Sequence, residues 1–275
     1  MTSRAADRWE AALLEWAIPE PILARAPEPP WVLPPQFFKV SVANPGADRP
    51  SLRLAREALG AAGSLLDVGC GGGGASLPLR DSAQEITGVD QQEEMLANFA
   101  EAWAAAEVPH REVLGRWPEV ADQVGLADVV VCNHVVYNVA RIEPFLRALT
   151  ERCRRRVVVE LTDTHPTAPF NFLWQHFWQL PRPSQPTAEL FLNVLRGLGY
   201  SPSVESVVTQ DSMAGPQDPP RMPRPDYVAF ARRRLCLTQD RDEEVDAVLG
   251  PIWPLEVERV VAVAWEPPPD SHATA

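Results

Sequence analysis

A run of glycines at the end of an apolar stretch is the part of this sequence best suited to chemistry. Residues 65–79 read LLDVGCGGGGASLPL, with Asp67 two residues before the first glycine. Glycines that follow a first parallel strand let the backbone approach a ligand and leave amides pointing at it. Two patterns overlap here, GxGxxG starting at Gly69 and DxGxGxG starting at Asp67, and they predict different cofactors.

The acid at the start of the second pattern discriminates between the two cofactors. A dinucleotide would bring a negatively charged pyrophosphate to this loop, and a carboxylate about 4 Å away would cost roughly 1–4 kcal/mol. S-adenosylmethionine instead brings an ammonium and a sulfonium, which Asp67 favours. A second acid, Asp90, ends the run EITGVD and could accept hydrogen bonds from both ribose hydroxyls, or only cap the helix that follows. The residues therefore favour S-adenosylmethionine, and a glycine loop without any ligand is the less favoured alternative.

Strand-like and helix-like stretches alternate along most of the chain, and this alternation positions the two acids. Strands separated by helices at this spacing form right-handed crossovers, which give a parallel sheet covered on both faces. Strands are expected at residues 64–68, 85–89, 111–114, 128–133, 156–161, 204–208 and, antiparallel beside the sixth, 257–265. Helices are expected at residues 5–18, 51–59, 75–80, 93–106, 141–154, 187–198, 227–236 (where a strand is the alternative) and 240–249. The expected fold class is α/β, with a Rossmann-like, seven-stranded, mostly parallel sheet.

The rest of the chain is expected to add a wrapping segment and a cap to this domain. Prolines recur between residues 19 and 50, so a short N-terminal helix should lead into an extended segment. After the fifth strand the alternation loosens, which is typical of insertions over a ligand site. The expected organisation is an N-terminal segment at 1–50, a cofactor-binding domain at 51–265 with helical or loop cap insertions at 165–200 and 209–250, and a disordered tail at 266–275.

Composition and charge exclude several classes of function. The net charge of −12 argues against a nucleic-acid partner, because phosphate binding relies on clustered Lys and Arg. The arginine runs 154–156 and 232–234 are expected at solvated helix ends or faces. No apolar run is long enough to cross a membrane, and the N-terminus lacks the apolar region of a secretory signal. The four cysteines have no metal-ligand spacing, which predicts no metal site and a cytoplasmic location. Nothing in the sequence indicates an oligomeric state.

The segments LLDVGCGGGG, GVD, VLGRWPEV and ADVVVCNHVVYNV, in this order and spacing, resemble the Rossmann-like (class I) S-adenosylmethionine-dependent methyltransferases. The resemblance runs from about Leu52 to Leu161 and is weaker to Tyr200. It implies that the methionine part of the cofactor lies against Asp67, Gly69, Cys70 and Gly71, and that the ribose is held by Asp90. It also implies that Gln91 lies beside the adenosine, that Arg116 and Trp117 border the adenine, and that Asn133 and His134 face the methionine and the methyl group.

Two departures from this family limit what the resemblance implies. Many members carry an acid after the third strand, where this chain reads GRWPE, and the Trp117 indole could either stack on the adenine or pack against the sheet edge. The chain also has NHVVYN in place of the DPPY-type motif. The sequence therefore gives less support to amino groups of nucleobases or of glutamine as the acceptors of the methyl group.

Few side chains at this edge of the sheet could move a proton. Methyl transfer from a sulfonium depends mainly on alignment, and a base is needed only when the acceptor must lose a proton early. His134, directly after the fourth strand, is the best candidate base, although it could equally shape the loop through a hydrogen bond. Tyr137 and Asn138 are weaker candidates. His165 follows the fifth strand with Asp163 and could orient a substrate, or the two could form an Asx-type turn.

An aromatic stretch after the fifth strand predicts a helical lid over an apolar acceptor pocket. Its apolar residues recur at helical spacing, so one stripe is core and part of it could line the pocket. Within the stripe we expect Trp174 and Phe177 to contact substrate. The full stripe is Phe170, Leu173, Trp174, Phe177 and Trp178, and the N-terminal aromatics that could close the other side are Trp9, Trp16, Phe37 and Phe38.

The function expected from these features is the transfer of a methyl group from S-adenosylmethionine to a small-molecule acceptor, with oxygen as the expected acceptor atom. A non-catalytic protein that binds S-adenosylmethionine or S-adenosylhomocysteine at the same site is the alternative. An NAD-dependent oxidoreductase is more remote. Such an enzyme needs a hydride-transfer partner such as a Tyr-x-x-x-Lys pair, and Lys39, far from the strand edges, is the only lysine.

Overall fold

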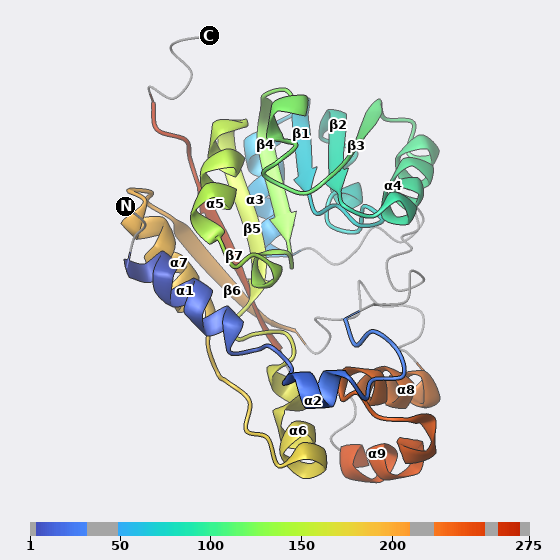
Figure 1. The fold of residues 1–275 in the computed structure, drawn as a ribbon. Coiled ribbons are helices and arrows are strands. Elements are labelled where there is room, and N and C mark those ends of the chain that lie inside the picture. Colours follow the sequence, from blue (N-terminus) through green and yellow to red (C-terminus); the bar gives the residue numbers. More distant parts are fainter. Residues whose placement is uncertain (1–3, 32–48, 210–222, 251–257, 270–275) are drawn as a thin grey trace.

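The computed structural model describes residues 4–31, 49–209, 223–250 and 258–269 (Figure 1). Their centre is a seven-stranded sheet with the strand order β3-β2-β1-β4-β5-β7-β6. Neighbours from β3 to β5 pair parallel, and β7 pairs antiparallel with both β5 and β6. The seven-stranded, mostly parallel sheet predicted from the sequence is confirmed. Its strands are β1 (Gly63–Val68), β2 (Ala83–Asp90), β3 (His110–Leu114), β4 (Ala127–Asn133), β5 (Cys153–Thr162), β6 (Ser203–Thr209) and β7 (Glu258–Trp265).

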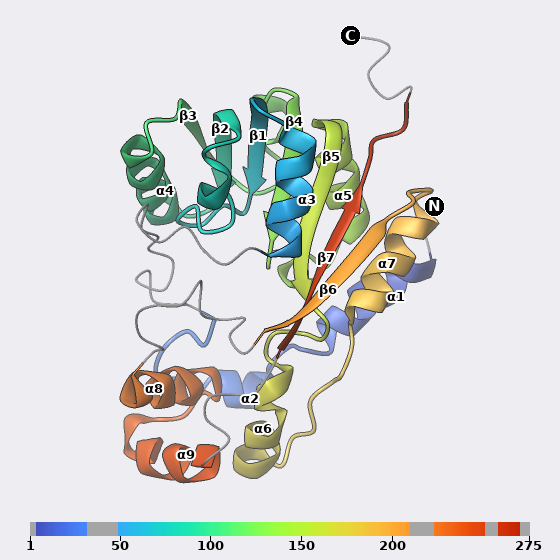
Figure 2. The same cartoon turned by 180° about the vertical axis from the view of Figure 1, so that it is seen from behind.

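The central strands are apolar along almost their whole length because helices cover them on both sides. The first face is covered by α1 (Arg4–Leu14), α5 (Ile142–Glu151) and α7 (Ala188–Gly197), and its core includes Trp9, Phe145 and Phe191. The opposite face is covered by α3 (Pro50–Leu59) and α4 (Glu93–Ala105), with Leu59, Phe99 and Trp103 in its core (Figure 2).

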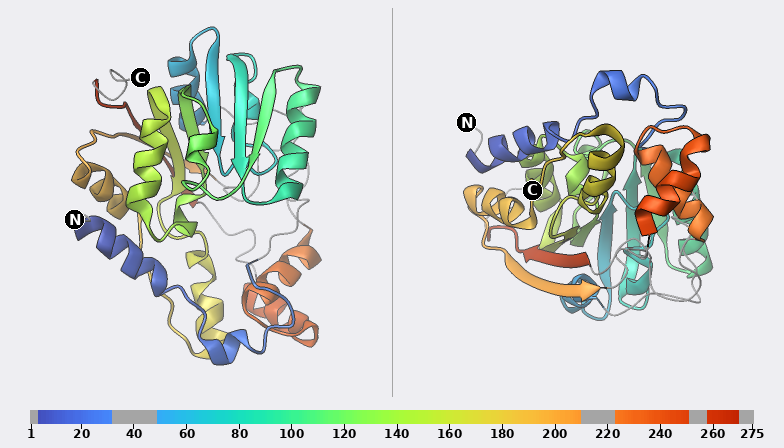
Figure 3. Two further views of the ribbon diagram at one scale, coloured as in Figure 1. Left: turned by 45° about the horizontal axis from the view of Figure 1, so that its top comes forward. Right: turned by 90° about the horizontal axis from the view of Figure 1, so that it is seen from below.

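A separate group of helices, here called the helical lobe, lies across the carboxyl edge of the sheet (Figures 1 and 3). It has its own apolar core, which includes Leu173, Trp174, Phe230 and Leu235. Most of the stretch 227–236 is helical and belongs to α8 (Arg224–Arg234), so the helix is confirmed and the alternative, a strand, is not. The lobe consists of α2 (Glu20–Leu23), α6 (Asn171–Trp178), α8 (Arg224–Arg234) and α9 (Asp242–Leu249).

Three expected helices differ in the structure. The helix expected at 5–18 ends at Leu14. The stretch 75–80 forms only the 3₁₀ turn η2 (Leu77–Leu79), because Pro78 has no amide to donate and disfavours the helical conformation of the residue before it. The helix expected at 141–154 ends at Glu151, and Cys153 already belongs to β5, where it pairs with Ala127. The remaining 3₁₀ turns are η3 (Ala121–Gln123), η4 (Val136–Asn138), η5 (Ala168–Phe170) and η6 (Gln239–Arg241).

Some expected features lie elsewhere than the sequence predicted or outside the described residues. The helix α7 falls within the predicted cap region but packs against α1 and the sheet core instead. Most of the predicted wrapping segment, with Phe37 and Phe38, and the end of the predicted tail lie outside the described residues. Among the residues that are described, no helix is long and apolar enough to cross a membrane.

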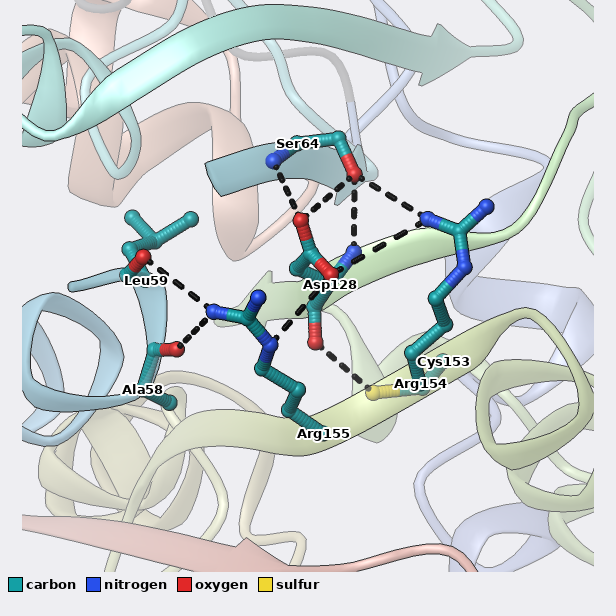
Figure 4. Close-up of polar contacts among 7 residues, drawn as sticks. All are labelled: Ala58, Leu59, Ser64, Asp128, Cys153, Arg154 and Arg155. Atoms are coloured by element: carbon teal, nitrogen blue, oxygen red, sulfur yellow. Dashed lines mark hydrogen bonds and ion pairs between the residues drawn. The ribbon is translucent and has the colours of Figure 1, made fainter. Parts of the chain in front are cut away.

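A partly exposed polar cluster around Asp128 on β4 joins strands at the amino edge of the sheet (Figure 4). Its carboxylate accepts hydrogen bonds from the amide and the hydroxyl of Ser64 on β1, at 2.9 and 3.2 Å. Arg155 on β5 forms an ion pair with the same carboxylate at 3.3 Å, and Arg154 lies 4.0 Å away. The arginine run 154–156 is therefore ion-paired and lies in a strand rather than on a helix, which corrects that part of the expectation, whereas Arg154 and Arg155 are exposed as expected.

Candidate functional site

The glycine loop after β1 has the backbone geometry that only glycines adopt easily. Gly69, Gly71 and Gly73 have φ values of 73°, 50° and 88°, all in the left-handed region. A Cβ atom at Gly69 would lie 2.3 Å from Cγ2 of Val135, in the segment that follows β4. The loop therefore passes close to the end of the neighbouring strand, at the carboxyl edge where open α/β sheets bind ligands.

Asp67 lies beneath this loop as a buried acid without a partner. Its side chain is completely buried, and neither carboxylate oxygen has a hydrogen-bond partner among the described residues. Burial raises the pKa of Asp67 to about 7, with a partial opposing effect from the Ser76 hydroxyl and a further rise from the charge of Asp90. A buried acid of this kind is stabilised in its charged form by a nearby cation. The arrangement fits the ammonium and the sulfonium of S-adenosylmethionine.

Asp90 connects the end of β2 to the glycine loop. Its Oδ2 accepts a hydrogen bond from the Gly71 amide and its Oδ1 accepts one from the Gln92 amide, both at 3.0 Å. Gln92 directly precedes α4, so the carboxylate does help to begin that helix. Each oxygen keeps a further acceptor site, which is what two ribose hydroxyls would need. Gln91 is exposed beside it.

The other residues implied for the cofactor lie in different environments. Trp117 is buried in the sheet core, and its indole N–H donates to the Phe145 carbonyl at 3.3 Å, so the structure favours packing over stacking on an adenine. Arg116 beside it is exposed. Cys70 is buried, and burial raises the pKa of its thiol. Asn133 ends β4 with its Oδ1 buried and without a hydrogen-bond partner among the described residues, so it could accept a donor from a ligand.

His134 is held by a residue that the sequence analysis did not single out, Glu160. The His134 amide donates to the Glu160 carbonyl at 2.8 Å, and its Nε2 lies 3.0 Å from Oε1 of the Glu160 carboxylate. Register explains the proximity, because the preceding residue, Asn133, pairs with Glu160 across β4 and β5. His134 has a φ of 58°, and its side chain is 34% exposed. The ring is therefore anchored at one nitrogen and accessible.

Glu160 is a charged residue in the buried, otherwise mostly apolar second half of β5. Burial alone would raise its pKa, but hydrogen bonds from His134 and Ser51 and the charge of Arg49, 2.9 Å away, hold the pKa of Glu160 at about 2. The carboxylate is therefore ionised and can only accept hydrogen bonds, so Nε2 of His134 is the protonated nitrogen. The only signal in the sequence was an acid in the run VVVEL.

Tyr137 and His165 belong to an aromatic cluster that includes the N-terminal segment. The Tyr137 hydroxyl donates to the Thr162 carbonyl at 2.7 Å, and its ring stacks on Trp9 with centroids 5.5 Å apart. His165 lies edge-on to Tyr137 and stacks on Trp16, with centroids 5.3 and 3.9 Å apart. Trp9 and Trp16 therefore contact Tyr137 and His165 from the N-terminal segment, and whether they close an acceptor pocket stays a prediction. Tyr137 is chiefly a buried packing residue.

His165 is a neutral ring at neutral pH. Burial, with the charges of Arg182 and Arg234, lowers the pKa of His165 to about 3. The Thr167 amide donates to Nδ1 at 3.3 Å, so the ring proton is on Nε2. Asp163, the other residue that could orient a substrate or form an Asx-type turn, is exposed. Its backbone amide donates to the Arg259 carbonyl, and its carbonyl accepts from the Ala188 amide.

The predicted lid residues lie in the helical lobe. Trp174 is buried in the core of the lobe, with the Arg182 guanidinium 4.8 Å from its ring centroid. Phe177 is half-buried, and its ring lies 5.2 Å from the guanidinium of Arg241. The buried residues of the predicted stripe, Phe170, Leu173 and Trp174, belong to the core of the lobe. Phe177 and Trp178 are half-buried, so a substrate contact would have to form there.

A cavity of about 270 Å³ lies at the opposite, amino edge of the sheet. It is lined by residues that begin β1, β3 and β4, including Ser64, His110 and Ala127. The glycine loop and both acids are at the carboxyl edge, so this cavity is not the cofactor site. No group of residues able to hold a metal ion is found in the described part of the chain.

Comparisons with known proteins match the glycine loop and the sheet to methyltransferases. Residues 66–159 match the family model described as a methyltransferase domain. A SAM-dependent methyltransferase from Thiobacillus denitrificans, solved with S-adenosyl-L-homocysteine, superposes with a TM-score of 0.52 at 18% identity, covering 91% of this chain and 99% of that one. The [4+2]-cyclase SpnF superposes with a TM-score of 0.50 at 16% identity, covering 78% and 79%. At these identities the structural likeness shows the fold. No curated protein matches the sequence.

Proposed function

We propose that this chain is an S-adenosylmethionine-dependent methyltransferase with the Rossmann-like (class I) fold, and that it methylates a small-molecule acceptor on oxygen. The observation that carries the proposal is the buried, partnerless carboxylate of Asp67 beneath a glycine loop of left-handed backbone. Such a carboxylate favours a cationic ligand and disfavours a pyrophosphate. The net charge of −12 supports a small acceptor over a nucleic acid, and a cytoplasmic location stays a prediction.

We assign the cofactor to the residues around the glycine loop. Asp67 acts through its charge, because it is too deeply buried to be touched directly. Gly69, Gly71 and Cys70 provide the loop backbone against the methionine part. Asp90 accepts the ribose hydroxyls at the acceptor sites that the Gly71 and Gln92 amides leave open.

When bound, S-adenosylmethionine supplies a methyl group whose leaving sulfur is already activated. The chain would supply alignment, worth up to about 7–11 kcal/mol in favourable cases, and a base for the acceptor hydroxyl. Nε2 of His134 donates its proton in a hydrogen bond to Glu160. The lone pair on Nδ1 is therefore the one that could take the proton from the hydroxyl of the methyl acceptor. Glu160 is a positioning residue in this scheme, since it fixes the tautomer and the ring orientation.

Calorimetric titration with S-adenosylmethionine, S-adenosylhomocysteine and NAD tests the cofactor assignment. We expect micromolar binding of the first two, no binding of NAD, and loss of binding in Asp90→Ala. Asp81→Ala is the matched control, because Asp81 lies just before the same strand but is 89% exposed. Binding of NAD alone, or of nothing, would contradict the proposal.

Single-turnover methylation of phenolic and alcoholic acceptors tests the chemistry. With an acceptor in hand, His134→Gln should lower the rate of methyl transfer by about 10²–10⁴-fold while leaving the affinity for S-adenosylhomocysteine unchanged. Cofactor binding without turnover on any acceptor would instead support the alternative, a non-catalytic binding protein.

A further inference from the structure

Two arginines of the described chain are partly buried and yet have no acidic partner. Arg182 precedes α7 and Arg234 ends α8. The protein has 37 acidic against 25 basic residues, so a shortage of carboxylates does not explain them. Every other described arginine that is at least partly buried contacts an acid: Arg49, Arg80, Arg152, Arg156, Arg224, Arg232, Arg233 and Arg241.

Arg182 lies between aromatic rings of the N-terminal segment and the helical lobe. Its guanidinium is 4.8 Å from the ring centroid of Trp174 and 5.5 Å from that of Trp16. It donates to the carbonyls of Trp16 and Ala17, while its Nε is buried without a partner. Carbonyls and ring faces orient a guanidinium, but they leave its charge without a counter-ion among the described residues.

Arg234 is in a similar situation at the end of α8. Its guanidinium lies 5.2 Å from the ring centroid of Phe230, and its buried Nε has no partner. The helix C-terminus and the ring face favour a cation, but neither supplies a negative charge to pair with the guanidinium. The sequence analysis expected a solvated residue here, and packing of the lobe buried it.

His165 shares an aromatic neighbour with Arg182. Its ring stacks on Trp16 with centroids 3.9 Å apart, and the Arg182 guanidinium lies 5.5 Å from the centroid of the same Trp16 ring. Burial, with the charges of Arg182 and Arg234, lowers the pKa of His165 to about 3. The neutral ring carries its proton on Nε2, where the described residues provide no acceptor. The ring also contacts Tyr137, three residues after His134. This part of the molecule therefore offers two guanidinium groups without an acid among the described residues and one N–H donor without an acceptor among them.

We propose that Arg182, Arg234 and His165 bind a carboxylate carried by the methyl acceptor, and that the acceptor body is aromatic. Guanidinium groups bind carboxylates through paired N–H donors, and a ligand carboxylate would supply the counter-ion that both arginines lack. The surrounding surface is aromatic, with Trp16 and Trp174 beside Arg182. This inference rests on the proposed function, since it names the acceptor class for the same site.

Binding of aromatic acids beside their neutral amides tests the proposal. The probes are 4-hydroxybenzoate and indole-3-carboxylate, each compared with its carboxamide by calorimetry in saturating S-adenosylhomocysteine. We expect at least one acid to bind wild type at least 10-fold more tightly than its amide. Arg182→Gln and Arg234→Gln should each reduce this ratio at least 10-fold. Arg241→Gln is the matched control, because its guanidinium also lies over a lobe ring but is paired with Glu244.

The outcomes separate this proposal from the proposed function. No preference for either acid in wild type, or a preference that both Gln variants retain, would overturn the carboxylate site. A loss of S-adenosylhomocysteine affinity in Arg234→Gln would assign the cation to the cofactor's own carboxylate and also overturn it. Failure of wild type to bind S-adenosylhomocysteine would instead refute the methyltransferase site. Arg234→Lys keeps the charge and should retain part of the preference, which excludes misfolding as the cause.

Discussion

Asp67 and Glu160 are buried carboxylates with opposite electrostatics. Asp67 has no partner, so burial raises its pKa to about 7, while Glu160 is surrounded by donors and its pKa is about 2. The first therefore weakens the folded state when it is ionised and the second strengthens it. At the scale of the residue, Asp67 would be stabilised in its charged form by a bound cation, whereas Glu160 already has its partners and fixes the position of His134.

The pH dependence of stability should reveal Asp67. Its folded pKa lies above the unfolded value of 3.8, so its contribution is lost as the pH rises from about 4 to 7. Asp67→Asn should therefore raise the free energy of unfolding at pH 8, by up to about 4 kcal/mol, and change it little at pH 4. Urea unfolding at both pH values measures this. Equal gains at the two pH values would contradict the shift.

Glu160 should show the reverse dependence. Its folded pKa is lowered, so its contribution is present above pH 4.5 and is lost as the pH falls toward 2. Glu160→Gln should reduce the free energy of unfolding at pH 7 by about 3 kcal/mol, with a smaller effect at pH 3. Glu189→Gln, an exposed acid on α7, is the control. An effect of Glu160→Gln that did not depend on pH would count against the ionised anchor.

At the scale of the element, the backbone of the glycine loop, rather than its side chains, shapes the proposed cofactor site. Gly69→Ala would place a Cβ 2.3 Å from Val135 at a φ of 73°. We expect a loss of about 1–3 kcal/mol in the free energy of unfolding and at least a 10-fold loss in S-adenosylhomocysteine affinity. Gly125→Ala, where no atom lies within 4 Å, should change neither quantity. Thermal melts and calorimetry on both variants decide this.

The helix α6 should separate packing from substrate binding. Trp174→Ala removes a buried ring from the lobe core and should cost about 3–5 kcal/mol, whereas Phe177→Ala, at a half-buried position, should cost less. If α6 lines the acceptor pocket, Phe177→Ala should also raise the KM for the acceptor. Lower stability with an unchanged KM in both variants would refute the role of α6 as a lid.

At the scale of the whole molecule, the N-terminal segment joins the sheet to the helical lobe. α1 packs on the sheet core, α2 belongs to the lobe, and Trp16 between them stacks on His165 and lies near Arg182. Trp16→Ala should therefore increase hydrogen exchange in the lobe helices while leaving β1, β4 and β5 protected. Trp31→Ala, at a 53% exposed position, is the control. Equal acceleration in the sheet would mean that the two parts unfold as one unit.

The local sequence pattern was sufficient to predict most of the sheet and the position of the glycine loop. Apolar runs predicted the central strands because burial on both faces leaves a direct trace in the sequence. The edge strands β3 and β6 were also predicted, although Leu114, Val204 and Val208 on them are exposed. Asp67 and the glycines could be interpreted for the same reason, since the spacing along one strand and its turn sets their geometry. The expected helix at 75–80 failed because Pro78 outweighed the crossover pattern.

Tertiary structure alone decided which charged residues were paired. Glu160 meets His134 because β4 and β5 are in register, and Arg49 and Ser51 reach it from the start of α3. Nothing near these residues in the sequence encodes those contacts. Likewise, Arg232, Arg233 and Arg234 are identical in type and adjacent, yet the first two are ion-paired and the third is not. The physical reason is that charge pairing depends on distance in space, whereas sequence patterns report only local burial and spacing.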